Sequence, residues 1–237
     1  MSDAPRIEHR HRELRGGAAR AAVFGFSDGL VTNVSLILGV AGAHPAGSFV
    51  RLAGIAGLVA GAFSMSAGEY VSMQAQRELF QRELDVERQA IRQSPVEEKA
   101  ELVQIYEQRG IDPEVARDLV DEVMQDPELA LETHAREELG IDPHALGVPL
   151  QAAGSSFGTF AAGAFVPLLP WLITSGNAAI VASIAAAAVA AVATGALLGT
   201  LSGRSMWRTA LRQLAIGVVA AGVTFGIGRL VGLGTGH

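Results

Sequence analysis

The sequence of 237 residues contains no cysteine, a single lysine and few aromatic residues. Without cysteine, the chain forms no disulfide framework and offers no thiolate ligand to a metal ion. We interpret the scarcity of lysine, which leaves arginine as nearly the only basic residue, as genome composition rather than function. Alanine and glycine dominate instead, and such small residues let membrane helices approach each other closely. The composition therefore favours a helical bundle over a transmembrane β-barrel.

The first 20 residues also lack the features of a secretory signal, since they are rich in arginine and histidine and have no cleavage site. Five apolar segments follow, each near the roughly 20 residues that a membrane-spanning helix needs. They cover residues 21–43, 52–75, 150–174, 178–202 and 209–233. We therefore expect an all-α membrane protein with five transmembrane helices.

The charged residues are concentrated in one part of the chain. Residues 77–142 hold 19 of the 24 acidic residues and 8 of the 18 basic ones, a local net charge of −11, whereas the rest of the chain carries +5. An acidic module of this kind favours cation handling and argues against a nucleic-acid partner. We divide the chain into a tail, 1–20; transmembrane helices 1 and 2, 21–76; an acidic helical metal-binding domain, 77–142; and transmembrane helices 3 to 5, 143–237.

Local signals predict where the helices of the acidic module begin. Ser94-Pro95, Asp112-Pro113 and Asp126-Pro127 each offer a capping side chain followed by a proline in the first helical position. The spacing from Ser94 to Glu97 also matches a capping box. The helix before Ser94 is expected to continue out of the second apolar segment, from Glu69 to about Gln93.

Arginines indicate the orientation in the membrane. They cluster in the N-terminal tail and in residues 203–212, and such clusters mark cytoplasmic segments. Counting crossings then places residues 77–142 in the cytoplasm and the C-terminus outside. We expect a multi-pass protein of the bacterial cytoplasmic (inner) membrane.

Asp28 is the one charged residue in the first apolar segment. A carboxylate at membrane depth is costly unless it faces a partner, water or an ion. We therefore predict a cation or proton site in a translocation path, to which Thr32, four residues on, and the nearby Asn33 add oxygen ligands. The alternative is that Asp28 lies near the membrane surface and pairs with Arg20.

Met65 and Glu69 lie four residues apart in the second apolar segment and so share one helical face. A thioether combined with carboxylates suits a softer ion such as Fe²⁺ better than Mg²⁺ or Ca²⁺. Taken alone, Met65 is better explained by ordinary packing. Glu69 is also consistent with a charge at the membrane surface.

Three pairs of potential metal ligands occur in the acidic module, each on one helical face. They are Glu83 with Glu87, Glu98 with Glu101, and His134 with Glu138. If the three helices converge, six ligands meet around one or more divalent ions. The alternative is a set of solvated faces that pair with Arg82, Arg88 and Arg92, but the local net charge favours metal.

Together these features resemble the vacuolar iron transporter family over nearly the whole chain, from about Arg20 to Leu233. The resemblance rests on FSDGL and GVAGA in the first apolar segment, AGAFSMSAGEYVS in the second and FVPLLPW in the third, and on the acidic insert. It implies a homodimer with five transmembrane helices per subunit and a pore at the dimer interface. It also implies export of Fe²⁺, and often Mn²⁺ or other divalent ions, from the cytoplasm in exchange for protons.

The resemblance assigns roles to single residues and also shows departures. Asp28 and Met65 match pore residues of the family, and its insert ligands match Glu87, Glu98, Glu101 and Glu138. Gly57 stands where plant members have a glutamate in the membrane. Our hypothesis is that Asn33 and Glu69 supply part of the polar role of that glutamate. Departures in the insert are Ala90 at an expected glutamate, and His134 and Ala135 at an expected pair of methionines.

We therefore predict a proton-coupled divalent metal transporter and not an enzyme. Its substrate is Fe²⁺ or another divalent transition metal, it has no prosthetic group, and its partners are protons, the lipid bilayer and a second copy of the chain. Two alternatives remain open, a membrane sensor that binds metal without transport and a membrane-anchored di-iron oxidase. Ferritin-like di-iron sites use two Glu-x-x-His motifs. The chain has one, Glu8 to His11, which argues against the oxidase.

Overall fold

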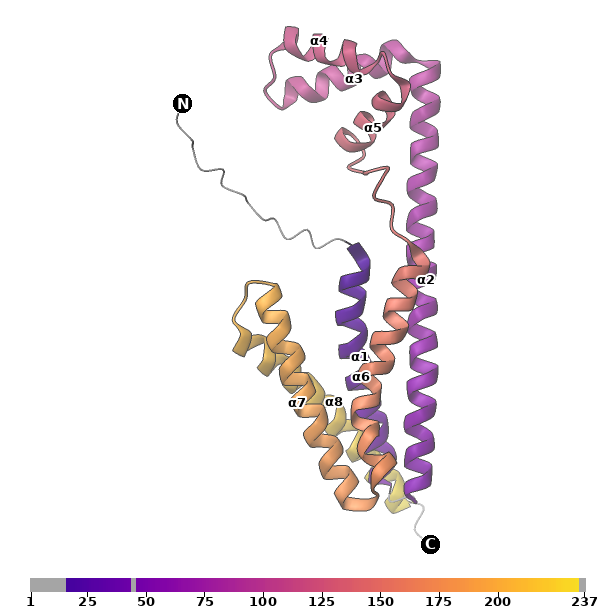
Figure 1. Cartoon of the computed structure of the whole chain (residues 1–237), viewed down its shortest axis with the longest axis vertical. Coiled ribbons are helices and arrows are strands. Elements are labelled where there is room, and N and C mark those ends of the chain that lie inside the picture. Colours follow the sequence, from indigo (N-terminus) through magenta and orange to yellow (C-terminus); the bar gives the residue numbers. More distant parts are fainter. Residues whose placement is uncertain (1–15, 44–45, 235–237) are drawn as a thin grey trace, which may run out of the picture. The chain divides into compact units, whose positions relative to one another are not determined.

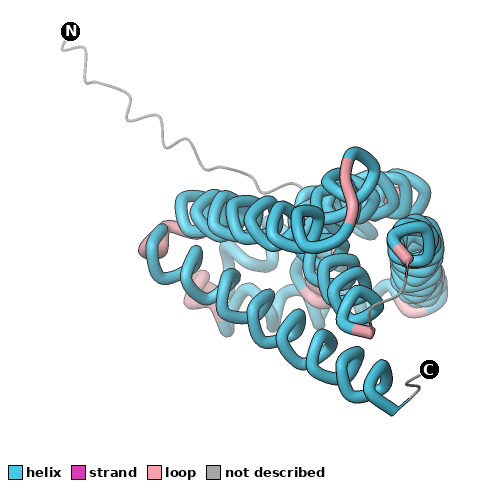
Figure 2. Tube along the Cα trace, turned by 90° about the horizontal axis from the view of Figure 1, so that it is seen from below, coloured by secondary structure: helices cyan, strands magenta, loops and turns pink. Residues whose placement is uncertain are grey.

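The computed structural model describes residues 16–43 and 46–234, and within these ranges the chain is helical with no strand (Figure 1). The described helices are α1 (Gly16–Gly42), α2 (Gly47–Gln93), α3 (Pro95–Gln108), α4 (Pro113–Val123), α5 (Pro127–Glu137), α6 (Pro149–Ile173), α7 (Gly176–Leu201) and α8 (Met206–Gly234). Most of the described connections are short loops, but residues 138–148 form a longer connection between α5 and α6 (Figure 2). The prediction of an all-α protein is confirmed. Glu8 and His11 lie outside the described residues.

Five of the described helices, α1, α2, α6, α7 and α8, are long and apolar enough to cross a membrane. They correspond in order to the five predicted apolar segments. α2 is much longer than its apolar part, with 47 residues. It continues to Gln93 as predicted, because no proline or glycine interrupts the chain after Gly68.

The chain divides into two compact units. The first, here called the bundle unit, contains the residues up to Tyr70 and those from Leu150 onward. The second, here called the insert, is Val71–Pro149. The predicted limits of the acidic domain, residues 77–142, fall within the insert.

Glycines allow close helix approach in the bundle unit. A Cβ atom on Gly29 of α1 would overlap the main-chain oxygen of Phe160 on α6. A Cβ atom on Gly163 of α6 would in turn overlap the main-chain oxygen of Phe26 on α1. The two backbones therefore meet with no side chain between them, which is how small residues stabilise membrane helix pairs.

α6 contains Pro167 and Pro170, each of which lacks a main-chain donor. Side chains of neighbouring helices donate to main-chain oxygens along this stretch. Asn33 of α1 bonds to the oxygen of Ala164 at 2.6 Å, and Ser183 of α7 bonds to that of Pro167 at 2.6 Å. These polar contacts support an irregular helix inside an apolar bundle.

In the insert, α3, α4 and α5 all begin at the predicted prolines, and two of the three predicted side-chain caps form. Asp112 accepts a hydrogen bond from the main-chain N–H of Glu114, and Asp126 accepts one from that of Glu128. α3 also begins at the predicted proline, but the side chain of Ser94 makes no capping bond, so the predicted capping box is wrong. The backbone of Ser94, with ψ 51°, is not in the extended conformation that aims a capping side chain at the helix.

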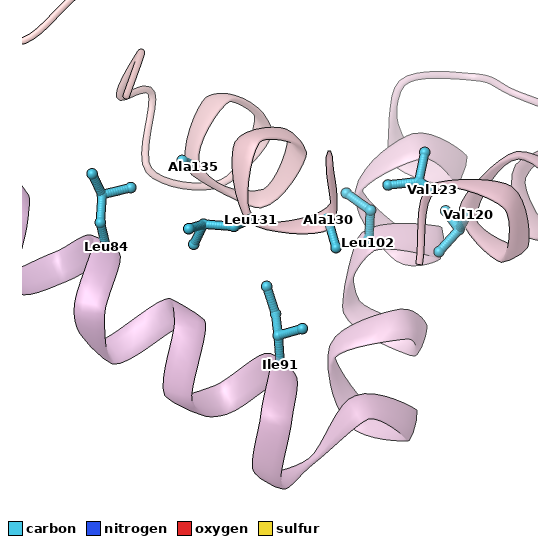
Figure 3. Close-up of a cluster of buried hydrophobic side chains, with 8 residues drawn as sticks. All are labelled: Leu84, Ile91, Leu102, Val120, Val123, Ala130, Leu131 and Ala135. Atoms are coloured by element: carbon cyan, nitrogen blue, oxygen red, sulfur yellow. The ribbon is translucent and has the colours of Figure 1, made fainter. Parts of the chain in front are cut away.

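One apolar core holds the helices of the insert together (Figure 3). Its buried members are Leu84 and Ile91 of α2, Leu102 of α3, Val120 and Val123 of α4, and Ala130, Leu131 and Ala135 of α5. In Figure 3 the side chains of Leu84 and Ile91 point from α2 toward α5. This core brings the acidic faces of three helices together.

Candidate metal centre

Four potential metal ligands lie together in the insert: Glu87 of α2, Glu98 of α3, His134 of α5 and Glu138 at the end of α5. One donor atom from each lies within 4.8 Å of the other three. His134 Nδ1 is 3.2 Å from Glu87 Oε1, 3.7 Å from Glu138 Oε2 and 3.9 Å from Glu98 Oε2. Among the described residues, no other group of three or more such side chains is comparably close.

The ligands lie on the same helical faces as the core residues. Glu87 is three residues after Leu84 and four before Ile91, so all three share one stripe of α2. Glu98 is four residues before Leu102, which is fully buried. Packing of the apolar residues therefore carries the carboxylates inward.

Burial leaves several polar atoms of the group without a partner. The side chain of His134 is 0% exposed, and those of Glu87 and Glu98 are 9% and 13% exposed. Neither ring nitrogen of His134, nor Oε1 of Glu87, has a hydrogen-bond partner in the described part of the chain. A buried polar atom without a partner costs about 1–3 kcal/mol. A cation among these four side chains would supply the missing interaction.

The carboxylates also raise each other's pKa. Burial, followed by the charges of Glu138 and Glu98, raises the pKa of Glu87 to about 7. Burial and the charge of Glu101 raise the pKa of Glu138. The group thus resists carrying all its negative charges at once, and a divalent ion would relieve this repulsion and displace protons.

The donor set and spacing suit a divalent transition metal. Three carboxylates and one imidazole provide oxygen and nitrogen ligands. For bonds of about 2.1 Å to one ion, neighbouring ligand atoms lie roughly 3.0–3.4 Å apart. The observed distances of 3.2–3.9 Å from His134 Nδ1 need only small inward movements to reach that range.

Two of the six predicted insert ligands lie outside this group. Glu83 is one turn before Glu87 on α2, beside the buried stripe and half-buried. Glu101 is exposed on α3, yet it is close enough for its charge to raise the pKa of both Glu87 and Glu138. The structure therefore brings four of the six side chains together.

In the bundle unit, Asp28 is half-buried on α1, and Thr32 Oγ1 donates to Asp28 Oδ1 at 3.3 Å. Phe24 and Leu36 continue the same stripe at intervals of four residues and are 64% and 37% exposed. The described helices of one chain thus leave this stripe of α1 largely open.

Asn33 lies on a different face of α1 and is fully buried. Its amide donates to the main chain of α6, and its Oδ1 atom has no hydrogen-bond partner among the described residues. Asn33 Oδ1 faces α2, and a Cβ atom built on Gly57 of that helix would lie 2.9 Å from Oδ1. Asn33 is therefore not a direct partner of Asp28 in this arrangement.

Met65 packs against a small apolar cluster that includes Phe160 and Ala164 of α6. Glu69 follows one turn later on α2 and is half-buried. Met65 thus contributes to the packing of α2 against α6. Its role on a transport path stays a prediction.

Gln213 of α8 is a buried residue that was not predicted from the sequence, and its amide donates to the hydroxyl of Ser27 on α1. This bond links two helices directly beside Asp28. The available signal was an amide side chain inside the fifth apolar segment, where interhelical hydrogen bonds are common.

A model of the VIT family matches residues 19–229 of the chain. The chain belongs to the VIT family. With five helices able to span a membrane in its described residues, this VIT family member is an integral membrane protein. The resemblance inferred from the sequence motifs is thereby confirmed.

Relatives with the same family name match over most of their length. Vacuolar iron transporter 1 of Arabidopsis thaliana is 32% identical over 217 residues, which cover 91% of this chain and 87% of that protein. The vacuolar iron transporter of Acanthamoeba castellanii is 33% identical over 225 residues, with coverages of 93% and 82%. Vacuolar iron transporter 1 of Oryza sativa subsp. japonica is 30% identical over 232 residues, with coverages of 96% and 92%.

The structure gives a physical account of one departure from the expected VIT pattern. A Cβ on Gly57 would overlap a methyl group of Leu36 and crowd Asn33 Oδ1. A glutamate at position 57 would therefore require the side chains of Leu36 and Asn33 to move in this protein.

Proposed function

We propose that this protein exports Fe²⁺, with Mn²⁺ as a second substrate, from the cytoplasm in exchange for protons. The observation that carries the proposal is the group of Glu87, Glu98, His134 and Glu138, in which the buried, unpartnered polar atoms of His134 and Glu87 suit a divalent ion. This group occurs in a chain whose described part contains five helices able to span a membrane. The names of the relatives, vacuolar iron transporters, support iron as the proposed substrate.

The insert is proposed to lie in the cytoplasm, where it captures the ion. Arg204, Arg208 and Arg212 are exposed between α7 and α8 and at the start of α8, and positive residues mark the cytoplasmic side. With five crossings, the insert lies on that same side. Its net negative charge raises the local concentration of divalent cations near the membrane.

The proposed membrane step uses the carboxylate of Asp28 and the hydroxyl of Thr32. A carboxylate binds a cation when ionised and loses much of that affinity when it takes up a proton. Protonation of Asp28 from the outer side would therefore release the ion there. Glu69, Met65 and Asn33 are the proposed remaining polar or polarisable positions of the path.

The active form is proposed to be a homodimer. The stripe of α1 that carries Asp28 is left open by the other described helices of its own chain, and an ionised carboxylate facing lipid is unfavourable. A second copy related by twofold symmetry would cover this stripe with the same stripe. Two Asp28 carboxylates would then face one path.

The test measures Fe²⁺ entry into liposomes that contain the purified protein and an Fe²⁺-sensitive dye, under anaerobic conditions, with and without a pH gradient. Wild-type entry is expected to depend on the gradient. Asp28→Asn, which removes the charge at constant size, is expected to fall to the rate of protein-free liposomes, and Asp28→Glu to retain part of the activity. Glu83→Gln, which alters a carboxylate outside the buried group, is the control and is expected to transport normally.

Other outcomes would overturn the proposal in identifiable ways. Binding of Fe²⁺ without movement under either gradient would indicate a sensor. Oxidation of Fe²⁺ with consumption of O₂ in a parallel aerobic sample would indicate an oxidase. Wild-type rates in Asp28→Asn would show that the path lies elsewhere.

A further inference from the structure

His134 differs in chemistry from the three carboxylates around it. We propose that His134 binds the ion through Nδ1 and makes the insert a site for one Fe²⁺, Zn²⁺, Co²⁺ or Ni²⁺ ion. We further infer that Mn²⁺ binds more weakly and that Ca²⁺ and Mg²⁺ are rejected. The inference rests on the proposed function only in treating this group as a metal site.

The geometry around the imidazole leaves a place for a cation. Nδ1 faces carboxylate oxygens of Glu87, Glu138 and Glu98 at 3.2–3.9 Å, and it makes a hydrogen bond with none of them. In the neutral ring with its proton on Nε2, the Nδ1 lone pair points at these oxygen lone pairs. Such an arrangement is repulsive unless a proton or a metal ion lies between them, and a single metal ion can contact all four side chains at once.

The donor types decide the class of ion. Imidazole suits iron, zinc and nickel, whereas sets of carboxylate, carbonyl and water oxygens suit magnesium, calcium and manganese. Ca²⁺ takes six to eight oxygen ligands, and Mg²⁺ keeps several of its waters. His134 is fully buried and Glu87 and Glu98 are 9% and 13% exposed, so of the four side chains Glu138, at 31% exposed, gives the main access for such extra water ligands.

The number of donors favours a single ion. The four donor atoms lie within 4.8 Å of one another, which is enough for one four-coordinate ion. Two ions would have to share these four side chains. Glu101 remains exposed beside the group and affects it through charge.

The first arm of the test compares metal affinities of the tag-free, full-length protein in detergent. In His134→Asn, the amide ends near the position of Nδ1 and still offers an oxygen. We expect its Co²⁺ affinity to fall by at least about tenfold, while its Mn²⁺ affinity changes much less. The ratio of the two affinities in one preparation cancels any loss of folded protein. An unchanged ratio would overturn the proposal.

The control for this arm is His144→Asn. His144 also lies in the insert near a carboxylate, with Nε2 3.6 Å from Glu132 Oε2, but its side chain is 75% exposed. The variant is expected to keep the wild-type ratio of affinities. A drop equal to that of His134→Asn would show that the effect is not specific to the buried ring.

The second arm needs no variant to fold. X-ray absorption of the wild type with one equivalent of Co²⁺ is expected to show the outer-shell scattering of one imidazole, and oxygen-only ligation would overturn the proposal. An imidazole signal without Fe²⁺ transport would contradict the proposed function and leave this inference standing. Fe²⁺ transport together with oxygen-only ligation would support the proposed function and overturn this inference.

Discussion

Glu87 keeps its proton up to about neutral pH in the metal-free protein. Burial and the charges of Glu138 and Glu98 raise its pKa from 4.5 to about 7. Because the pKa is higher in the folded than in the unfolded chain, its contribution to stability is present at low pH. That contribution is lost as the pH rises through about 7. A divalent ion must displace this proton.

Metal binding by the full-length protein is therefore expected to strengthen between about pH 6 and pH 8, with up to roughly a tenfold gain per pH unit for each proton released. Glu87→Gln is expected to bind less tightly at the upper end and to show a flatter pH dependence. Calorimetry in two buffers of different ionisation enthalpy counts the protons released. Glu83→Gln should match the wild type, and equal proton release from Glu87→Gln would contradict the assignment.

The difference between Glu83 and Glu87 also shows what the sequence can predict of the site. Their spacing of four residues indicates that they share a face, but it does not say which of them turns inward. The apolar pattern carries that information, since Glu87 lies in the stripe of Leu84 and Ile91 and Glu83 lies one position beside it. Which helix this stripe meets depends on packing between distant segments, which no local pattern specifies.

At the scale of elements, α5 is the helix on which the site depends most. It has 11 residues, carries His134, and ends next to Glu138. Helices this short are marginal without caps and tertiary contacts. Asp126 provides the cap, accepting hydrogen bonds from the main-chain N–H groups of Glu128 at 2.9 Å and Leu129 at 3.4 Å.

Removal of this cap is expected to weaken both stability and metal binding. Asp126→Ala should lower the free energy of unfolding of the insert by about 1 kcal/mol, and Asp126→Asn by less. Hydrogen exchange of the α5 amides measures the first effect and Co²⁺ titration the second. Asp112→Ala is the matched control, because it removes the cap of α4, which carries no site residue. Equal losses of affinity in the two alanine variants would show that the cap of α5 does not position the ligands.

The elements that the sequence predicted best are those whose signals are local. The starts of α4 and α5 follow from an aspartate and a proline in adjacent positions. α2 begins at Gly47, five residues before the apolar segment at 52–75, because the helix continues through Arg51, where the hydropathy falls. Hydropathy predicts which residues lie in the membrane, whereas main-chain hydrogen bonds determine where a helix begins and ends.

At the scale of the whole molecule, composition predicted close helix contacts but not which helices make them. Gly29 and Gly163 are 134 positions apart in the sequence and lie where α1 and α6 meet. Many other glycines in the apolar segments look equivalent in the sequence. Their partners depend on the order of helices around the bundle, which is a property of the assembled chain.

The absence of cysteine allows the proposed orientation to be tested without first removing native thiols. Single cysteines are introduced as Gln125→Cys in the insert, Ser202→Cys between α7 and α8, and Thr174→Cys between α6 and α7, all at exposed positions. In right-side-out vesicles, an impermeant maleimide is expected to label only Thr174→Cys, because two crossings separate Gln125 from Ser202 and one separates each from Thr174. Permeabilised vesicles provide the control, in which all three should react.

Labelling of Gln125→Cys and Ser202→Cys but not Thr174→Cys would invert the orientation and with it the direction of transport. Labelling of Gln125→Cys and Ser202→Cys from opposite sides would mean that α6 and α7 do not both cross the membrane.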